Sequence, residues 1–259
     1  MSDRRLHPDA THVQTSIPGQ IKEPLVDLLA APKGPRDRQL VLGEAVTTIG
    51  TCQNFNYVKA AKDGYIGWVR AHAIGPPSTP THQVTAAATH AYAEASIKSF
   101  NRVTLTFGAR LTAHSDNNDF IETSLGHVPK TALSDYPAEP QNPVTTARLF
   151  LNTPYLWGGN SRSGIDCSGL IQAVMIAAAL ACPGDSDQQE HALGGDVTDQ
   201  SYQTRDLLFW QGHVAMITSA TTMIHANAFH MNVTEELIGP AINRIALTGG
   251  GPVTSHKRL

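Results

Sequence analysis

Short runs of alternating apolar and polar residues, separated by polar turns, make up the first half of the chain. Residues 40–47, 56–59 and 67–69 form one series of such runs, with a Lys-Asp-Gly turn at residues 62–64. Runs of this length and spacing predict a small β-barrel. A similar series follows at residues 105–112, 119–122 and 126–128. The first half of the chain therefore predicts two copies of one module.

The last part of the chain has a different pattern. Asn142 followed by Pro143 predicts a helix start, because Asn caps helices well and Pro fits the first helical position. Residues 168–181 are nearly all apolar, a run too long for a typical strand and too short for a membrane span, which predicts a buried helix. Strand-like runs follow at residues 207–210, 213–217 and 222–226. A helix layer followed by an antiparallel sheet predicts an α+β fold.

Two stretches rich in proline and polar residues, 75–81 and 134–142, predict linkers. They divide the chain into three parts. The predicted domains are an N-terminal arm plus a first barrel (1–75), a second barrel (83–135) and an α+β domain (142–259). Residues 1–20 are interpreted either as an arm that packs across the domains or as a loose tail.

The composition narrows the class of protein. Hydrophobic residues make up 41% and charged residues 16%, which excludes a disordered chain with too little apolar area to fold. The net charge is −3 at pH 7, and without a basic surplus we expect no nucleic-acid partner. No apolar run approaches the ~20 residues that cross a bilayer, so we expect no membrane partner. We also expect the protein to be a monomer.

The N-terminus and the cysteines bear on the compartment. No apolar core follows the first residues, whereas a secretory signal needs one of roughly 7–15 residues, so we expect a cytoplasmic protein. The three cysteines, Cys52, Cys167 and Cys182, are odd in number and widely spaced, which disfavours a disulfide framework. We interpret Cys52 and Cys182 as small buried hydrophobic residues.

Cys167 differs from the other two cysteines because it stands at the start of the predicted buried helix. Asp166 precedes it and is the expected helix cap. Unpaired N–H groups and the helix dipole concentrate positive potential at such an end, which favours the thiolate over the thiol. Because the thiolate is the nucleophilic form, Cys167 is a candidate nucleophile.

A nucleophilic cysteine needs a base, and two histidines lie on predicted neighbouring strands, His213 and His225. One ring could contact the thiol while the other orients the first ring and fixes its tautomer. These side chains could alternatively bind zinc, but the chain lacks a C-x-x-C or H-x-x-x-H pair of zinc ligands. We therefore expect no metal and no cofactor. We interpret His127 and His191 as satisfied polar residues, and His230 as either a wall of the site or a structural residue.

Five motifs in this part of the chain occur in a recognisable order. They are PYLWGG (154–159), DCSG (166–169), DLLFW (206–210), GHV (212–214) and IHA (224–226). Their order closely resembles the NlpC-type cell-wall cysteine peptidases, a papain-like family. The resemblance implies Cys167 as nucleophile, His213 as general base, His225 as the third member and Tyr155 near the oxyanion. Arg205 stands where the family usually has glycine, so we expect an altered turn there.

The first half of the chain carries a second resemblance. The segments LGEAV (42–46), YIGW (65–68) and AHAI (71–74), whose order recurs in the second series, resemble bacterial SH3-like domains. The implied architecture is α+β: a papain-like NlpC catalytic domain preceded by two small SH3-like β-barrels. This arrangement resembles the γ-D-glutamyl-L-diamino acid endopeptidases, which act on murein peptides with a free N-terminal L-Ala.

That subgroup also implies residues that bind the substrate. The segment CPGDSDQQ (182–189) resembles a subgroup motif in which an arginine precedes the aspartate, a position that glycine occupies here. The resemblance implies that Asp185 holds the substrate ammonium, that Ser168 helps it, and that Tyr65 and Glu44 of the first barrel complete the pocket. Glu44 equally suits a turn carboxylate. A buried ammonium needs paired acceptors, and a closed cleft behind it excludes longer, N-blocked chains.

The main hypothesis is a cytoplasmic cysteine endopeptidase that cleaves the γ-D-Glu–diamino acid bond of released murein peptides. The first alternative is an exported peptidoglycan hydrolase whose SH3-like domains bind the intact wall. A second is an acyl- or amide-transfer enzyme on the same scaffold, and a third is a catalytically silent binding module. The sequence leaves the diamino acid, diaminopimelate or lysine, open.

Overall fold

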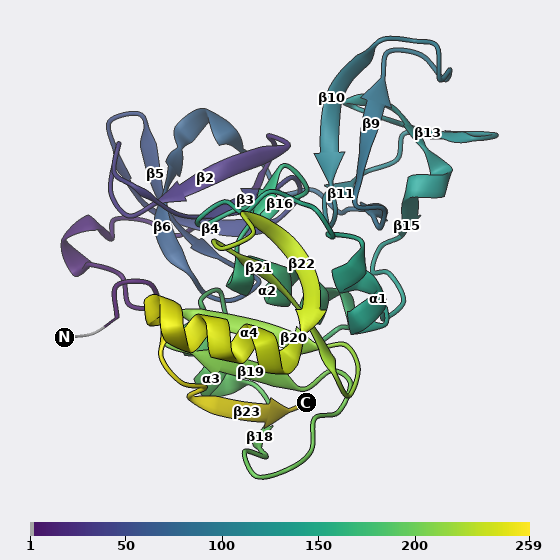
Figure 1. Ribbon diagram of the computed structural model, residues 1–259. Coiled ribbons are helices and arrows are strands. Elements are labelled where there is room, and N and C mark those ends of the chain that lie inside the picture. Colours follow the sequence, from purple (N-terminus) through teal and green to yellow (C-terminus); the bar gives the residue numbers. More distant parts are fainter. Residues whose placement is uncertain (1–2) are drawn as a thin grey trace. The chain divides into compact units, whose positions relative to one another are not determined.

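The computed structural model describes residues 3–259, and the chain divides into two compact units, Met1–Glu139 and Pro140–Leu259 (Figure 1). The division falls inside the segment 134–142, which is rich in proline and polar residues. No helix among residues 3–259 is long and apolar enough to cross a membrane.

The first barrel of the N-terminal unit is an antiparallel sheet in the order β3-β2-β6-β5-β4-β1-β7. Its strands are β1 (Ile17–Ile21), β2 (Leu25–Leu29), β3 (Arg36–Val41), β4 (Ala45–Cys52), β5 (Phe55–Ala60), β6 (Ile66–Arg70) and β7 (Ile74–Gly75). Side chains of β4 are buried at alternate positions, as expected for a strand with one face on the core. That core contains Ile21, Leu28, Leu40, Val58 and Val69.

The segment before β1 packs on this barrel. Arg4 donates to both carboxylate oxygens of Asp37 at 2.6 and 2.7 Å. The His12 ring lies edge-on to Trp68, with 5.2 Å between ring centroids. Together with β1, which pairs with β4, these contacts attach residues 3–21 to the first barrel. The first two residues of the predicted arm lie outside the described residues.

The second barrel contains two antiparallel sheets, in the orders β10-β9-β14-β13-β12 and β11-β8-β15. Its strands are β8 (His82–Val84), β9 (Ala88–Tyr92), β10 (Asn101–Thr106), β11 (Arg110–Leu111), β12 (Ser115–Asn117), β13 (Phe120–Thr123), β14 (Gly126–Pro129) and β15 (Leu133–Asp135). Leu42 of the first barrel joins its core, beside Val84, Leu105 and Val128. Shared packing of this kind explains why both barrels form one compact unit.

The two barrels repeat one turn. The predicted runs 40–47 and 105–112 are each broken by a glycine, Gly43 with a φ of 79° and Gly108 with a φ of 80°. This left-handed conformation favours glycine because a side chain would clash there. Each run therefore contains the end of one strand and the start of the next, joined by a tight turn.

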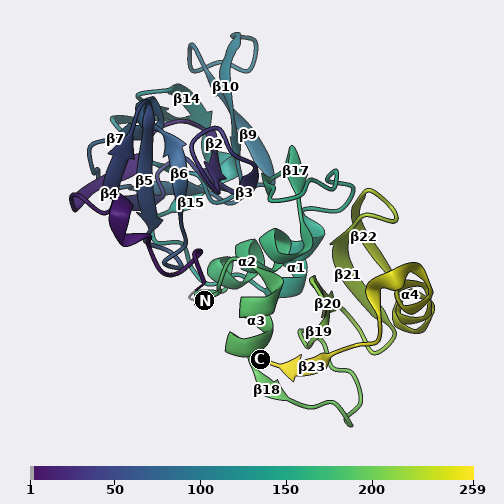
Figure 2. The same ribbon diagram turned by 90° about the vertical axis from the view of Figure 1, so that its left-hand side faces the viewer.

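The C-terminal unit has an antiparallel sheet in the order β18-β23-β19-β20-β21-β22, with helices on both sides. The strands of this sheet are β18 (Gly195–Asp196), β19 (Leu207–Trp210), β20 (His213–Ile217), β21 (Thr222–Asn227), β22 (Asn232–Leu237) and β23 (Ser255–Arg258). Two further strands, β16 (Asn160–Ser161) and β17 (Gly164–Ile165), form a separate two-stranded sheet. The helices of the unit are α1 (Pro143–Arg148), α2 (Cys167–Ala177), α3 (Ser186–Ala192) and α4 (Ile238–Ile245). Figure 2 shows α2 and α3 on one side of β19–β22 and α4 on the other.

Local sequence signals explain where these helices begin and end. Asn142 caps α1, since its Oδ1 accepts from the backbone N–H groups of Val144 and Thr145 at 3.0 and 3.2 Å. The predicted helix at 168–181 ends earlier, at Ala177, because Ala179 adopts a φ of 58° that a helix cannot contain. Short 3-10 helices lie at Ala10–His12, Ala71–Ala73 and Lys130–Ala132, and a π-helical segment at Ala246–Gly250.

The three predicted strands of this unit correspond to β19, β20 and β21. The turn before β19 contains Arg205, which has a φ of 80° and whose N–H donates to the carbonyl oxygen of Ile217 at 2.8 Å. Because this conformation favours glycine, the turn keeps the geometry that a glycine there would adopt. Whether this turn differs from that of the family stays a prediction.

Candidate active site

Asp166 organises the start of α2. Its Oδ1 accepts from the N–H of Gly169 at 2.6 Å and from the Ser168 hydroxyl at 3.1 Å. Its Oδ2 accepts from the N–H of Gly158 at 2.8 Å. One carboxylate thus caps the helix and holds the loop 154–159 against it, which fixes the backbone on both sides of Cys167.

Cys167 is the first residue of α2 and is buried, with 6% of its surface exposed. Its Sγ lies 4.0 Å from the carbonyl oxygen of Gly212, the residue before His213. Burial, followed by the nearby Asp166 carboxylate, raises the pKa of the Cys167 thiol to about 12, and backbone N–H groups, that of Val214 first among them, oppose the shift only in part. The thiol is therefore protonated at neutral pH. Backbone N–H groups at the helix end do lower this pKa, as expected, but burial outweighs them, so the net shift favours the thiol.

The rate at which iodoacetamide alkylates Cys167 is expected to rise about tenfold per pH unit between pH 6 and 9. A thiol whose pKa is raised carries little thiolate in this range, and that fraction grows tenfold with each pH unit below the pKa. Intact-protein mass measured over time in a Cys52→Ala background gives the rate. A rate that stays constant below pH 7 would instead indicate a preformed thiolate–imidazolium pair.

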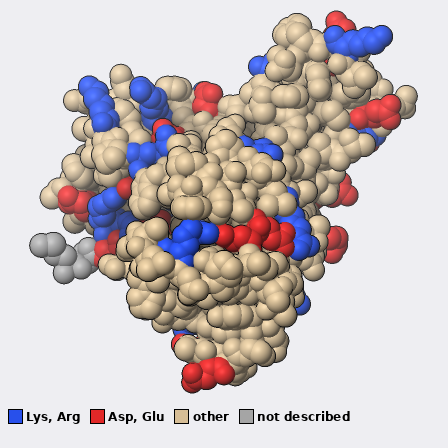
Figure 3. Space-filling model, viewed as in Figure 1, with Lys and Arg blue, Asp and Glu red and all other residues tan. Residues whose placement is uncertain are grey.

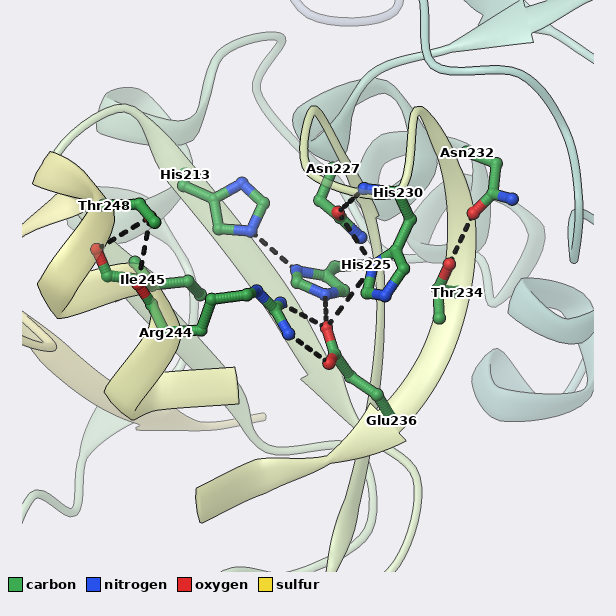
Figure 4. A network of polar contacts seen from close by, with 10 residues as sticks. All are labelled: His213, His225, Asn227, His230, Asn232, Thr234, Glu236, Arg244, Ile245 and Thr248. Atoms are coloured by element: carbon green, nitrogen blue, oxygen red, sulfur yellow. Dashed lines mark hydrogen bonds and ion pairs between the residues drawn. The ribbon is translucent and has the colours of Figure 1, made fainter. Parts of the chain in front are cut away.

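The two histidines lie on one face of the sheet. Ile217 of β20 is opposite Met223 of β21, and side chains two or four residues away share that face. His213 and His225 satisfy this spacing, and Nε2 of His213 lies 2.7 Å from Nδ1 of His225 (Figure 4). The predicted pairing of two imidazoles on neighbouring strands is thus present in the structure.

A carboxylate follows the histidines. Nε2 of His225 lies 2.7 Å from Oε1 of Glu236, on β22. Arg244, on α4, donates to both oxygens of Glu236 at 2.6 Å. The side chains of His213, His225, Glu236 and Arg244 form a continuous series of polar contacts, which Figure 4 shows.

The charges within this series follow from burial and pairing. Burial, followed by the neighbouring His225, lowers the pKa of His213 to about 3, and burial also lowers the pKa of His225. Burial raises the pKa of Glu236, but hydrogen bonds from Arg244 and His225 outweigh it and lower this pKa to about 2. Near pH 7, both rings are therefore neutral and Glu236 is ionised, so that His213 is able to accept a proton.

Charged side chains gather over β22 and α4, as Figure 3 shows. Besides the pair of Glu236 and Arg244, Glu235 accepts from Nε and Nη2 of Arg148 at 3.0 and 2.7 Å. Neighbouring residues of a strand point to opposite faces, so the two glutamates have separate arginine partners. Only Glu236 contacts a histidine of the site.

Tyr155 lies on the loop that Asp166 holds. Its N–H donates to the carbonyl oxygen of Met231 at 2.8 Å, and its backbone pairs with Ile165. Burial, followed by the nearby Cys167 and Asp166, raises the pKa of the Tyr155 hydroxyl above its usual value. The hydroxyl is therefore a hydrogen-bond donor at any physiological pH, which suits the predicted place near an oxyanion.

Asp185 precedes α3 and is half-buried. The side-chain amide of Gln189, one turn later, donates to the carbonyl oxygens of Ser168 at 2.9 Å and Pro183 at 3.0 Å. Gln172 of α2 donates to the carbonyl oxygen of Cys182 at 3.0 Å. These bonds hold the segment around Asp185 against the N-terminal part of α2, where Ser168 lies.

Tyr65 and Glu44 belong to the N-terminal unit. Tyr65 is 2% exposed within the core of the first barrel, with the Arg38 guanidinium 5.1 Å from its ring centroid. Oε1 of Glu44 accepts from Lys62 Nζ at 2.6 Å, while its Oε2 is buried without a partner among the described residues. Their roles toward a substrate stay predictions.

The remaining cysteine and histidine interpretations have mixed outcomes. Cys182 is buried as expected, whereas Cys52 is half-buried. His191 places Nδ1 2.6 Å from the carbonyl oxygen of Asp187, but Nδ1 of His127 is buried without a partner within residues 3–259, so this histidine is not the satisfied residue expected. Across the same residues, no group of three or more His, Cys, Asp or Glu side chains is placed to hold a metal ion.

Sequence reasoning missed Glu236, Arg244 and the bridging role of Gln189. The QQ pair at 188–189 was visible in a motif, but its amide has no chemistry that would single it out. Two adjacent glutamates in a β-prone run at 232–237 are a signal that one of them faces inward. Which one does so depends on the register of β22, which the sequence leaves open.

Comparison with known proteins finds similarities in two regions of the chain. Residues 152–243 match the NlpC/P60 family, and residues 28–74 match the bacterial dipeptidyl-peptidase Sh3 domain. Over 87 residues, 34% of this chain and 32% of the relative, the chain is 38% identical to dipeptidyl-peptidase 6 of Lysinibacillus sphaericus. Over 133 residues, 48% of this chain and 37% of the relative, it is 31% identical to a gamma-D-glutamyl-L-lysine dipeptidyl-peptidase of Bacillus cereus. The chain thus matches about a third of the length of these relatives.

A solved structure shows the same fold. The crystal structure of an NlpC/P60 family protein from Bacillus cereus superposes with a TM-score of 0.76 at 20% identity, covering 93% of this chain and 99% of that one. This match and the two family models confirm the expected α+β fold class, with an NlpC-type domain behind an SH3-type domain. The C-terminal unit therefore has the NlpC/P60 fold, with residues 152–243 matching that family, behind an N-terminal SH3-type domain that matches at residues 28–74.

Proposed function

We propose that the protein is a cysteine peptidase that cleaves the bond between γ-D-Glu and the diamino acid in murein peptides with a free N-terminal L-Ala. The observation that carries this proposal is the thiol of Cys167 beside the backbone of Gly212, followed by two paired histidines. Nε2 of His213 on β20 lies 2.7 Å from Nδ1 of His225 on β21. The names of the relatives support the bond: two are gamma-D-glutamyl-L-lysine dipeptidyl-peptidases.

The acylation step uses Cys167 and His213. Because the thiol is protonated at rest, His213 takes its proton at Nδ1 as Sγ attacks the γ-carbonyl carbon of D-Glu. The oxygen of that carbonyl gains negative charge, which the backbone N–H of Cys167 and the hydroxyl of Tyr155 stabilise as donors. His213 then returns the proton to the amine of the departing diamino acid, leaving a thioester on Cys167.

The deacylation step reverses these roles. Water gives a proton to Nδ1 of His213 as its oxygen attacks the thioester carbon. The C–S bond breaks, and the proton returns to the sulfur of Cys167. The products are the dipeptide L-Ala-D-Glu, with a free γ-carboxylate, and the diamino acid or the peptide that begins with it.

Substrate selection would fall to Asp185. A carboxylate on the segment held against α2 offers a partner for the L-Ala ammonium, and Ser168 lies in the same region. Glu44 and Tyr65 remain proposed contributors from the first barrel. An absolute need for the free amine restricts the enzyme to peptides already released from the glycan, which is the basis for a role in recycling inside the cell.

We expect the protein to cleave L-Ala-γ-D-Glu-meso-diaminopimelate at least about 100-fold faster, in kcat/KM, than its N-acetylated twin. Acetylation removes the ammonium and leaves its carboxylate partner unpaired, which costs binding in the transition state. Product masses over time give both rates, with L-Lys in place of diaminopimelate as a second pair. Equal cleavage of both twins would keep the nucleophile and instead favour hydrolysis of the intact wall.

A further inference from the structure

The polar contacts of the site continue beyond the second histidine to an ionised carboxylate. On β22, Glu236 is opposite Met223 and Thr234 is opposite His225, so Glu236 is the diagonal neighbour of His225. Met223 packs with Ile238 and Ala241 of α4, which places this face of the sheet under that helix. Arg244, one turn further along α4, is thereby in reach of the carboxylate, and donates to both of its oxygens.

The hydrogen bonds along the series have only one consistent direction. An ionised carboxylate accepts and never donates, so Nε2 of His225 must carry the hydrogen that bridges to Glu236. A neutral imidazole carries one ring hydrogen, which leaves Nδ1 of His225 bare and makes it an acceptor. Nε2 of His213 must then carry the hydrogen between the two rings, and Nδ1 of His213 is bare.

We propose that Glu236, oriented by Arg244, is a positioning residue that fixes the tautomers of His225 and His213 and so keeps the Nδ1 lone pair of His213 free for the thiol proton. The inference rests on the proposed function, in which His213 is the base for Cys167. When His213 takes that proton, its positive charge is stabilised through His225 by the negative charge of Glu236. Figure 4 shows Nδ1 of His213 on the side of the ring away from His225.

The neighbours of Glu236 fit this role. The other histidine nearby, His230, has Nδ1 3.1 Å from the side-chain oxygen of Asn227 and 3.9 Å from Oε1 of Glu236. Arg244 also lies over the ring of Phe229, 4.5 Å from its centroid, which holds the guanidinium in place from a second side. Glu235, next in the chain, has the same chemistry and a bidentate arginine but no contact with the histidines, so it is the matched control.

The first test reads the tautomers directly in the wild-type protein. Histidine ring ¹⁵N shifts, recorded at pH 7 with ¹⁵N-histidine labelling, distinguish bare from protonated nitrogens, and His213→Gln and His225→Gln variants assign the signals. We expect both histidines to carry their hydrogen on Nε2. A hydrogen on Nδ1 of either ring would overturn the proposal, since His213 would then lack a lone pair toward the thiol or His225 would not donate to Glu236.

The second test compares variants. We expect Glu236→Gln to lower kcat by about 10–100-fold with KM unchanged within about twofold, and to mix the two tautomers of His225. Glu236→Asp, which keeps the charge, should retain more activity than Glu236→Gln, and Glu235→Gln should keep the wild-type kcat. The kcat of Arg244→Lys, which loses the bidentate geometry, should lie between that of Glu236→Gln and that of Glu235→Gln. If Glu236→Gln does not fold, Glu236→Asp and Arg244→Lys carry the comparison.

The two proposals fail in different ways. If the wild-type protein leaves every γ-D-glutamyl peptide intact, yet shows both predicted tautomers, and Glu236→Gln mixes the tautomers of His225, the proposed function is contradicted and this inference stands. Active enzyme in which Glu236→Gln keeps both tautomers and its kcat within threefold would show that Glu236 and Arg244 only tie β22 to α4.

Discussion

Replacing Cys167 by alanine is expected to lower kcat/KM for L-Ala-γ-D-Glu peptides by at least about 10⁴-fold. The substitution removes the only proposed nucleophile, and a remaining oxyanion site with bound substrate gives little hydrolysis without it. The fold should persist, because shortening a buried cysteine side chain to the methyl group of alanine costs only about 1 kcal/mol of unfolding free energy. Initial rates at several substrate concentrations, together with a thermal unfolding curve, measure both effects.

Cys182 is the matched control for this substitution. It is as buried as Cys167, and its Sγ lies 3.5 Å from the carbonyl oxygen of Pro183. Cys182→Ala should therefore keep hydrolysis within about threefold while losing a similar amount of stability. Hydrolysis that survives in Cys167→Ala, or that disappears in Cys182→Ala with the fold intact, would contradict the assignment of the nucleophile.

Replacing His213 by glutamine is expected to have the next largest effect, a fall in kcat of about 10³-fold with little change in KM. The thiol of Cys167 is protonated at rest because burial raises its pKa, so the reaction needs a group that removes the proton. Glutamine keeps much of the size and polarity of the ring but cannot accept and return a proton. Steady-state kinetics at pH 7 give the two parameters separately.

The pH dependence of that variant is a further readout of the same prediction. Without a base, the residual rate depends on the small thiolate fraction, which grows with pH below the raised pKa of Cys167, so the defect should shrink from pH 7 to pH 9. His191→Gln is the control, since that exposed ring places Nδ1 2.6 Å from the carbonyl oxygen of Asp187 in its own helix. A pH-independent defect would indicate that His213 acts on the fold and not on the proton.

Much of this site follows from local signals that the sequence carries. The Asp166–Cys167 step marks the start of α2 because a capping carboxylate before an apolar run is a helix N-terminus, and the structure begins α2 at that residue. The strand β19 occupies the predicted residues, since four apolar residues between turns leave little freedom. The paired histidines follow from the spacing of β20 and β21, which places both rings on one face.

Other properties depend on tertiary burial, which no local pattern reports. The helix end at Cys167 predicts a thiolate, yet the surrounding sheet buries the sulfur and raises its pKa. Glu235 and Glu236 are identical in type and adjacent, and only the register of β22 against β21 decides that Glu236 meets His225. Arg244 completes the contact from a helix whose position over the sheet is set by packing at Ile238 and Ala241.

The most direct test of the account is the mass of the products that the wild-type protein releases from L-Ala-γ-D-Glu-L-Lys and from its meso-diaminopimelate counterpart. The account predicts two products from at least one of these peptides, the dipeptide L-Ala-D-Glu and the free diamino acid, both absent with Cys167→Ala. Release of free L-Ala, or both peptides staying intact while Cys167 is reduced and open to alkylation, would contradict it.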